Sequence, residues 1–209
     1  MNHGSLDAPQ RRRAAAIAGF CGDTDRVIAL WHDTDPKVRI AAMRALAKLE
    51  ATQQVSCEFV EQALEDALAD GDPRVRIAAL EVASRYSQPP LEPMLSDDDP
   101  MVVECAAWAL GERQVDSKTI IARLSEVVRE HADPLVRESA VAALGAIGDR
   151  RGLPALLQAT RDKVTVRRRA VIALAAFEGP EVEAAYERAR FDRDRQVRDA
   201  VEELLGPTQ

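Results

Sequence analysis

One short phrase recurs along this chain, and it limits the folds that the chain can adopt. The four clearest copies share an Asp-Pro pair before a branched apolar residue, and they are DTDPKVRIAA at 33–42, DGDPRVRIAA at 70–79, DDDPMVVECA at 97–106 and HADPLVRESA at 131–140. Weaker copies follow at 166–167 and 192–198, and the copy at 9–14 is degenerate, with a register defined only to within one residue. Taken at its Val position, the phrase stands at residues 11, 38, 75, 102, 136, 166 and 197. A repeat of roughly 30 residues is typical of a solenoid.

The phrase has the chemistry of a helix start. An Asp side chain accepts hydrogen bonds from free backbone N–H groups of the first turn, and Pro at the first helical position loses no hydrogen bond. Apolar residues then follow at helical spacing; in the copy at 33–42 they are Val38, Ala42, Leu46 and Leu49. This spacing predicts one buried stripe on each helix that the phrase opens. Each such second helix pairs with a first helix before it, so the predicted unit is a helical hairpin.

We expect one continuous domain over residues 9–205, between a short disordered lead at 1–8 and a tail at 206–209. The hairpin units are predicted near residues 9–22, 23–52, 53–87, 88–114, 115–148, 149–178 and 179–205. Prolines at 89, 90 and 93 leave room for only a turn before the second helix of the fourth unit. No strand pattern is present.

Composition narrows the function classes. The chain is 46% hydrophobic but only 4% aromatic, which favours thin layers of Ala, Val and Leu. Its formal charge of −7 argues against general nucleic-acid binding. Two basic clusters, Arg11–Arg13 and Arg167–Arg169, are interpreted as solvated or ion-paired faces, and whether the second binds anything is left open. We expect a cytoplasmic protein, because neither a signal peptide nor an 18-residue apolar run is present.

Cysteine usage points to neither a disulfide framework nor a metal site. The three cysteines, Cys21, Cys57 and Cys105, are widely spaced, and no CxxC pair occurs. Cys105 lies on a predicted core stripe, so we expect a small buried side chain. The sequence therefore predicts no metal and no cofactor.

With the later Ala-Leu-Gly at 109–111 and 143–145, the phrase resembles the HEAT repeat. It is most similar to the short HEAT-like type also seen in phycobilisome lyase subunits. The resemblance covers residues 9–205 and implies an all-α fold, a right-handed α-α superhelix (solenoid) of six to seven HEAT-like hairpins.

The resemblance also implies a structural ladder between adjacent repeats, formed by the Asp and by the Arg six positions later. The matching pairs are Asp33 with Arg39, Asp70 with Arg76, and Asp192 with Arg198. The ladder is expected to break at three positions where other residues stand, namely Val103, His131 and Arg161.

Some proteins of this architecture are enzymes. Deoxyhypusine hydroxylase holds two irons with repeated His-Glu dipeptides, but here His3, His32 and His131 each lack a following Glu. We therefore expect no enzyme and can name no catalytic residue. The alternatives are a subunit of a bilin-lyase-like enzyme and, less favoured, a HEAT-like nucleic-acid-binding protein.

The favoured function is a scaffold or adaptor that binds another protein or peptide, as a monomer or in a hetero-complex, away from membranes. The second helices of a solenoid line its concave face, so residues opposite the core stripe are candidate partner-binding residues. They are Ile40, Met43, Arg44, Ile77, Leu80, Glu81, Glu104 and Trp108. Trp108 and Met43 are the expected anchors. The competing interpretation is that the residue five after each Val, as at Met43, packs between successive second helices.

Overall fold

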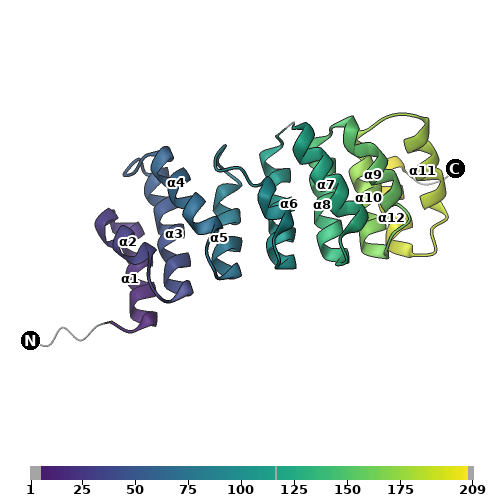
Figure 1. The fold of residues 1–209 in the computed structure, drawn as a ribbon. Coiled ribbons are helices and arrows are strands. Elements are labelled where there is room, and N and C mark those ends of the chain that lie inside the picture. Colours follow the sequence, from purple (N-terminus) through teal and green to yellow (C-terminus); the bar gives the residue numbers. More distant parts are fainter. Residues whose placement is uncertain (1–5, 116, 207–209) are drawn as a thin grey trace, which may run out of the picture. The chain divides into compact units, whose positions relative to one another are not determined.

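The computed structural model describes residues 6–115 and 117–206, which form helices joined by turns and loops (Figure 1). No strand occurs within the described residues, so the all-α prediction is confirmed. The helices group into two compact units, Met1–Pro90 and Leu91–Gln209, where one domain over 9–205 was predicted. The single domain stays a prediction, and each unit is considered by itself.

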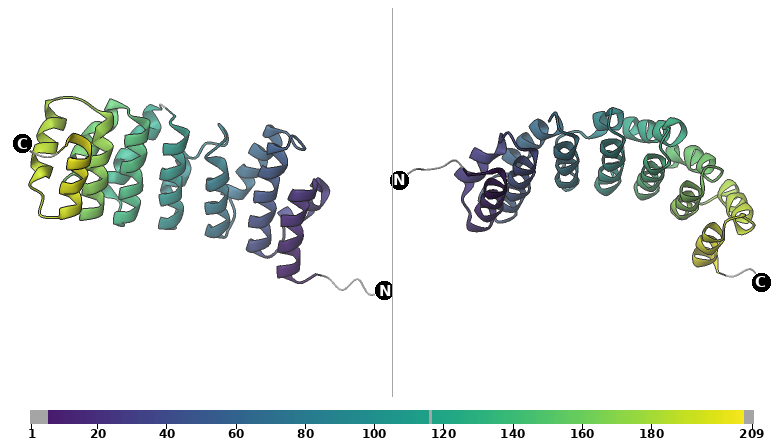
Figure 2. Two further views of the ribbon diagram at one scale, coloured as in Figure 1. Left: turned by 180° about the vertical axis from the view of Figure 1, so that it is seen from behind. Right: turned by 90° about the horizontal axis from the view of Figure 1, so that it is seen from below.

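The N-terminal unit consists of two rows of helices. Helices α1, α3 and α5 lie side by side in one row, and α2 and α4 form the other (Figure 2). The row of α1, α3 and α5 contains the second helices, and the other row contains first helices. The bounds are α1 Ala8–Cys21, α2 Thr24–Trp31, α3 Pro36–Ala51, α4 Cys57–Leu68 and α5 Pro73–Ala83.

The C-terminal unit repeats this arrangement. Second helices α6, α8, α10 and α12 lie side by side, and first helices α7, α9 and α11 cover them. The short 3-10 helix η1 takes the place of a first helix before α6, as the prolines predicted. The bounds are η1 Glu92–Ser96, α6 Pro100–Arg113, α7 Lys118–Glu130, α8 Pro134–Ile147, η2 Arg150–Gly152, α9 Leu153–Ala159, α10 Val164–Ala173, η3 Leu174–Ala176, α11 Pro180–Arg190 and α12 Arg195–Leu205.

The recurring Asp-Pro pair begins the second helices as its chemistry predicts. In α3, the Asp35 side chain accepts from the backbone N–H of Lys37 at 2.8 Å, and Pro36 occupies the first turn. The same cap opens α5, α6 and α8, and Asp194 caps α12 without a proline. Each cap satisfies a donor that the helix itself leaves free.

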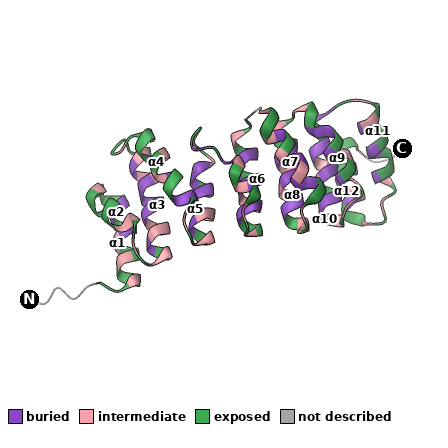
Figure 3. Ribbon diagram, in the orientation of Figure 1, coloured by how far each residue is buried: buried purple, intermediate pink, exposed green. Residues whose placement is uncertain are grey.

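Small residues set the distance between second helices. A Cβ built on Gly145 of α8 would lie 2.7 Å from Cβ of Ala173 in α10, and one on Gly111 of α6 would lie 2.9 Å from Cα of Ala143 in α8. These distances are shorter than side-chain carbons tolerate, so the Gly of Ala-Leu-Gly lets the next helix approach closely. The stripe from Val38 to Leu49 is buried, and Figure 3 shows such buried residues on the helix sides that face other helices.

A few details differ from the sequence-based predictions. The first helix begins at Ala8, inside the predicted lead, while residues 1–5 of that lead and 207–209 of the tail lie outside the described residues. The helix predicted to end at Phe177 ends at Ala173 and continues as η3. Cys105 is only partly buried, so the expectation of a core cysteine was wrong.

Candidate functional site

Adjacent second helices are tied together by bidentate ion pairs, which we call rungs. Each rung joins an Arg of one repeat to the Asp that precedes the next second helix. Four rungs are Arg11–Asp33, Arg39–Asp70, Arg137–Asp162 and Arg167–Asp192. All eight N–O distances lie between 2.6 and 2.9 Å. Fork-to-fork pairing of this kind fixes direction as well as distance.

Both partners of a rung are held by further hydrogen bonds. Arg39 donates from Nη1 to the Asp33 carbonyl at 2.8 Å, so one guanidinium contacts two successive turns. Asp70 accepts from the backbone N–H of Asp72 at 2.8 Å, which orients its carboxylate toward Arg39. The hydrogen bonds from Arg137 hold the pKa of Asp162 below its ordinary value, and Arg167 does the same for Asp192. These rung carboxylates are therefore stabilised in their ionised form, and the ion pairs have a structural role.

The six-residue pairs quoted from the sequence are joined differently from the rungs. Within one repeat the Arg donates to the backbone carbonyl of its Asp, as Arg76 does at Asp70 and Arg198 does at Asp192. The carboxylate that pairs with Arg39 belongs to Asp70 of the following repeat. The ladder thus connects repeats through residues 22 to 31 positions apart.

Two rungs lie in a register that the sequence analysis missed. The predicted break at Arg161 was wrong, because Asp162 takes the Asp position one residue later, in a shorter turn. Arg167 consequently reaches a carbonyl five residues back, on Asp162, instead of six. Arg11 occupies the Arg position of the first copy, and not the Val position, so that copy shifts by one residue. The sequence does contain a signal for this register, because Asp162 is the carboxylate closest before Val166.

Among the described helices, the rung between α6 and α8 is absent, because neither its Arg nor its Asp is present. Val103 of α6 stands where the Arg is expected and is buried. His131, which precedes α8, stands where its Asp is expected, and its Nδ1 accepts from the backbone N–H of Asp133 at 3.2 Å. His131 thus reproduces the turn hydrogen bond of the Asp but carries no carboxylate. The paired exchange leaves no buried charge without a partner at this step.

The predicted partner-binding residues divide into accessible and buried ones. Met43 and Leu80 are 2% and 0% exposed, so their predicted place on an accessible face was wrong. Both lie five after the Val, where packing between second helices was the competing interpretation. The other six are accessible to some degree: Ile40, Arg44, Ile77 and Glu81 in the N-terminal unit, and Glu104 and Trp108 in the C-terminal unit. Trp108, on α6, is 42% exposed.

A groove runs along the exposed side of α1 and α3, and we call it the basic groove. Its volume is about 830 Å³. Its apolar lining residues are Pro9, Ala16, Phe20, Ile40, Ala41 and Ala45. Its polar lining residues are all cationic, namely Arg12, Arg13, Lys37, Arg44 and Lys48. Only Ile40 and Arg44 of this groove were among the predicted partner-binding residues, and Arg12 and Arg13 had been interpreted as part of a solvated cluster.

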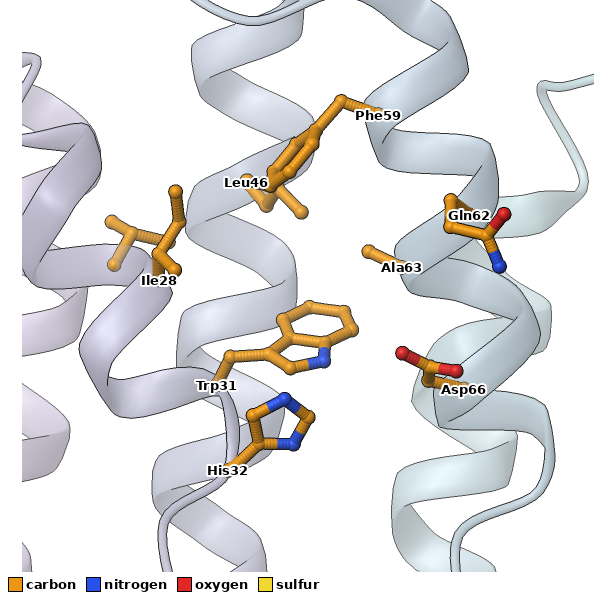
Figure 4. Close-up of a pocket in the computed structure, with 9 residues that line it drawn as sticks. Ile28, Trp31, His32, Leu46, Phe59, Gln62, Ala63 and Asp66 are labelled. Carbon is orange, nitrogen blue, oxygen red and sulfur yellow. The ribbon is translucent and has the colours of Figure 1, made fainter.

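A second hollow opens on the opposite row of the same unit, between α2 and α4. Figure 4 shows Trp31 and His32 on one side, Phe59, Gln62 and Asp66 on the other, and Leu46 behind them. Its volume is about 240 Å³. The lining is mainly apolar, with the polar side chains toward one end. No sequence prediction pointed to this cleft, because first helices carry no recurring phrase.

Among the described residues, His32 and Asp66 line the cleft between α2 and α4, whereas the lining of the basic groove has no His, Cys, Asp or Glu. Within residues 6–115 and 117–206, no group of three or more His, Cys, Asp or Glu side chains could hold a metal ion. Partial desolvation and the neighbouring Glu61 raise the pKa of the Cys57 thiol, which disfavours the nucleophilic thiolate. Among the helices described, none combines the length and apolar character that a bilayer-spanning segment requires.

Comparison with known proteins agrees with this architecture. The family model of HEAT repeats matches residues 61–125 and 121–206, which is well over half of the chain. No curated protein matches the chain. The crystal structure of YibA from E. coli is similar at 19% identity and a TM-score of 0.76, over 96% of this chain and 77% of that one.

Two further solved structures share the fold. An engineered protein matches at 18% identity and a TM-score of 0.61, over 96% of this chain and 65% of that one. Kap95p, in a structure that describes its binding to RanGDP, matches at 18% identity and a TM-score of 0.60, over 94% of this chain and 32% of Kap95p. At these identities the likeness shows the fold alone, and it confirms the predicted solenoid class.

Proposed function

Because the chain belongs to the HEAT-repeat family, whose members typically serve as protein-interaction scaffolds, we propose that it is a non-catalytic scaffold that binds another protein through its second helices. Kap95p, which shares the fold, binds RanGDP. The cytoplasmic location stays a prediction from the sequence.

The basic groove is the single observation that carries this proposal. It is the larger of the two hollows described, at about 830 Å³, and it lies on the row of second helices. Phe20 at its side is 77% exposed and adjoins the apolar lining of the groove, so its ring extends an apolar surface that a partner can cover. An aromatic side chain beside cations is the composition of many interface anchors.

The enzyme alternative has less support. A bilin-lyase-like subunit would need a reactive group near a hollow, and the basic groove is lined by Ala, Pro, Ile, Phe, Arg and Lys side chains, without a thiol, an imidazole or a carboxylate. Cys57, the thiol whose pKa is raised, is not among the residues that line either hollow. Nucleic acid is also disfavoured, because the chain as a whole carries a formal charge of −7.

Site-specific photo-crosslinking tests the proposal. A benzophenone amino acid replaces Ala16 in the basic groove, or Gln158 on first helix α9 as a matched exposed control. We expect one protein to be captured from the Ala16 position, in amounts reduced by Phe20→Ala, and not from the Gln158 position. Capture from Gln158 alone would place the partner on the other row, and no protein adduct from either position would exclude the scaffold.

A further inference from the structure

The charge of the basic groove identifies the chemistry of its ligand. We propose that the groove binds an acidic peptide segment of the partner protein, which places carboxylates on the cations and at least one apolar side chain beside Phe20. This inference rests on the proposed function, since it specifies the partner of the same face.

The first support is the one-sided charge of the lining. The cations that line the groove come from both helices, Arg12 and Arg13 from α1 and three from α3, and no carboxylate lines it. The chain nevertheless carries 35 acidic and 28 basic residues, so an all-cationic lining runs against its composition. A local field of this sign attracts an anionic ligand despite the net charge of the protein.

The second support is that the nearest carboxylates among the described residues form no ion pair with Arg12 or Arg13, although Asp35 lines an adjoining hollow together with Arg12 and Lys37. Asp33 is bound to Arg11 in a rung, and Asp35 caps α3 by accepting from the backbone N–H of Lys37. Within the described residues, no ion pair holds Arg12 or Arg13. These two guanidinium groups are therefore available to a ligand.

Two cations of α3, Arg44 and Lys48, make only weak contacts within the protein. Arg44 donates to Glu81 at 2.8 Å, but both side chains are largely exposed, and such a pair contributes little stability. The ammonium group of Lys48 lies over the ring of Phe20. A carboxylate of a ligand can therefore reach Arg44 in exchange for Glu81, and an apolar side chain can contact the open ring edge of Phe20.

The dimensions fit a short peptide. Lys37, Arg44 and Lys48 stand at spacings of seven and four on one side of α3, so they span about 16 Å along the helix axis. An extended peptide covers that length with about five residues, at about 3.3 Å each. Two or three of its carboxylates would meet the cations, while Ile40 and Ala41 lie beside its apolar side chains.

A single-stranded nucleic acid is the competing anionic ligand. Sequence-independent binding of single strands needs successive aromatic platforms on which bases stack. The groove offers only one ring, that of Phe20, and its other apolar residues are Pro, Ala and Ile. The observations therefore favour a peptide over a nucleic acid.

The test selects ligands without knowledge of the partner. A phage-displayed library of random 12-residue peptides is selected on the full chain, on Arg12→Gln/Arg13→Gln, and on Arg161→Gln/Arg168→Gln. The last variant is the matched control, because it neutralises two exposed arginines of the other unit. Circular dichroism verifies that all three proteins keep equal helix content.

We expect peptides selected on the unaltered chain and on the control to be net acidic with an apolar residue. Fluorescence anisotropy measures the affinity of these peptides for each protein. Compared with the unaltered chain, Arg12→Gln/Arg13→Gln should lower the affinity at least tenfold and Phe20→Ala several-fold. The affinity for the unaltered chain should also fall as the salt concentration rises. Replacing the Glu and Asp residues of a selected peptide by Gln and Asn should weaken it at least tenfold.

Three outcomes would overturn the inference: selected peptides of neutral or basic composition, equal binding by Arg12→Gln/Arg13→Gln, or no enrichment on any protein. A 12-nucleotide oligothymidylate that binds more tightly than the selected peptides would show a nucleic-acid groove instead. The proposed scaffold function survives the first two outcomes if the Ala16 crosslink still captures a protein, so the two failures are distinguishable.

Discussion

The guanidinium of Arg137 donates to both carboxylate oxygens of Asp162, at 2.6 and 2.7 Å, although the two residues lie 25 positions apart. The same guanidinium donates to the carbonyl of His131 at 2.7 Å. One side chain therefore fastens the start of its own helix to the start of the next second helix. Since each hairpin is too thin to bury its apolar side alone, this connection sets how neighbouring hairpins are aligned.

Breaking this rung should lower the free energy of unfolding. We expect Arg137→Gln or Asp162→Asn to cost about 2 kcal/mol each, because the remaining partner is largely buried and loses charged hydrogen bonds. The double variant should cost clearly less than the sum, with a coupling above about 1 kcal/mol. Urea unfolding followed by circular dichroism gives these values.

The exposed pair of Arg195 and Asp199, 3.4 Å apart on α12, is the control for that cycle. Neutralising it should leave unfolding nearly unchanged, because solvent screens exposed pairs. Strict additivity of Arg137→Gln and Asp162→Asn would show that the rung contributes nothing as a pair.

Acid should weaken the protein through the rung carboxylates. Hydrogen bonds from Arg137 and Arg167 lower the folded-state pKa values of Asp162 and Asp192 from 3.8. A carboxyl whose pKa is lowered by folding stabilises the protein above its unfolded pKa, and this stabilisation is lost as the pH falls through the folded pKa. The free energy of unfolding should therefore fall between about pH 5 and pH 2.

Asp162→Asn tests the assignment of that pH dependence. The variant should be less stable than the unaltered chain at pH 7, and the difference should shrink as the pH falls toward 2. Glu203→Gln, at an exposed position of α12, should leave the curve unchanged. A constant difference between Asp162→Asn and the unaltered chain at every pH would mean that the Asp162 carboxylate is not the titrating group.

Adding one methyl group between two second helices should be costly. Gly145→Ala places a Cβ 2.7 Å from Cβ of Ala173, so α8 and α10 must move apart. We expect a net loss of about 1–2 kcal/mol, although Ala favours a helix over Gly by up to about 1 kcal/mol. Gly71→Ala is the control, since no atom outside its own residue and its two chain neighbours lies within 4 Å of its added Cβ, and its thermal midpoint should stay within a few degrees. Equal effects of the two changes would refute the close approach.

Two residues on α6 should respond in opposite ways to truncation. Trp108 is 42% exposed and Leu110 is 1% exposed. We expect Leu110→Ala to cost about 2–5 kcal/mol and Trp108→Ala less than half as much. Thermal melting compares them, and retained stability in Trp108→Ala would keep that side chain available for a partner. A larger loss for Trp108 than for Leu110 would assign it to the core.

Local chemistry explains which parts of the fold were predictable. Asp and Pro fix the first turns of α3, α5, α6 and α8 without help from other residues, so their starts coincide with the predictions. Register within a shortened turn depends on which carboxylate reaches the neighbouring guanidinium. Asp162 was missed for this reason, because the spacing of the other copies pointed to Arg161.

Surface assignments were less predictable, because they depend on what packs beside a helix. A helical wheel places Met43 opposite the stripe of Val38, but neighbouring side chains cover it. Arg12 belongs to a cluster visible in the sequence, yet its role depends on α3 bringing Lys37 and Arg44 to the same groove. The burial of Met43 and the position of Arg12 both depend on neighbouring helices, so the sequence of one helix does not reveal them.

The paired loss at Val103 and His131 has a consequence for how such a chain can gain or lose repeats. Removing the hairpin that supplies Asp162 and Arg167 would present Arg137 to Asp192, a like-for-like replacement. Removing the hairpin that supplies His131 and Arg137 would instead present Val103 to Asp162 and strand a carboxylate. The ladder of ion pairs would therefore stay complete after the loss of a repeat at one junction and be left with an unmatched carboxylate at the other.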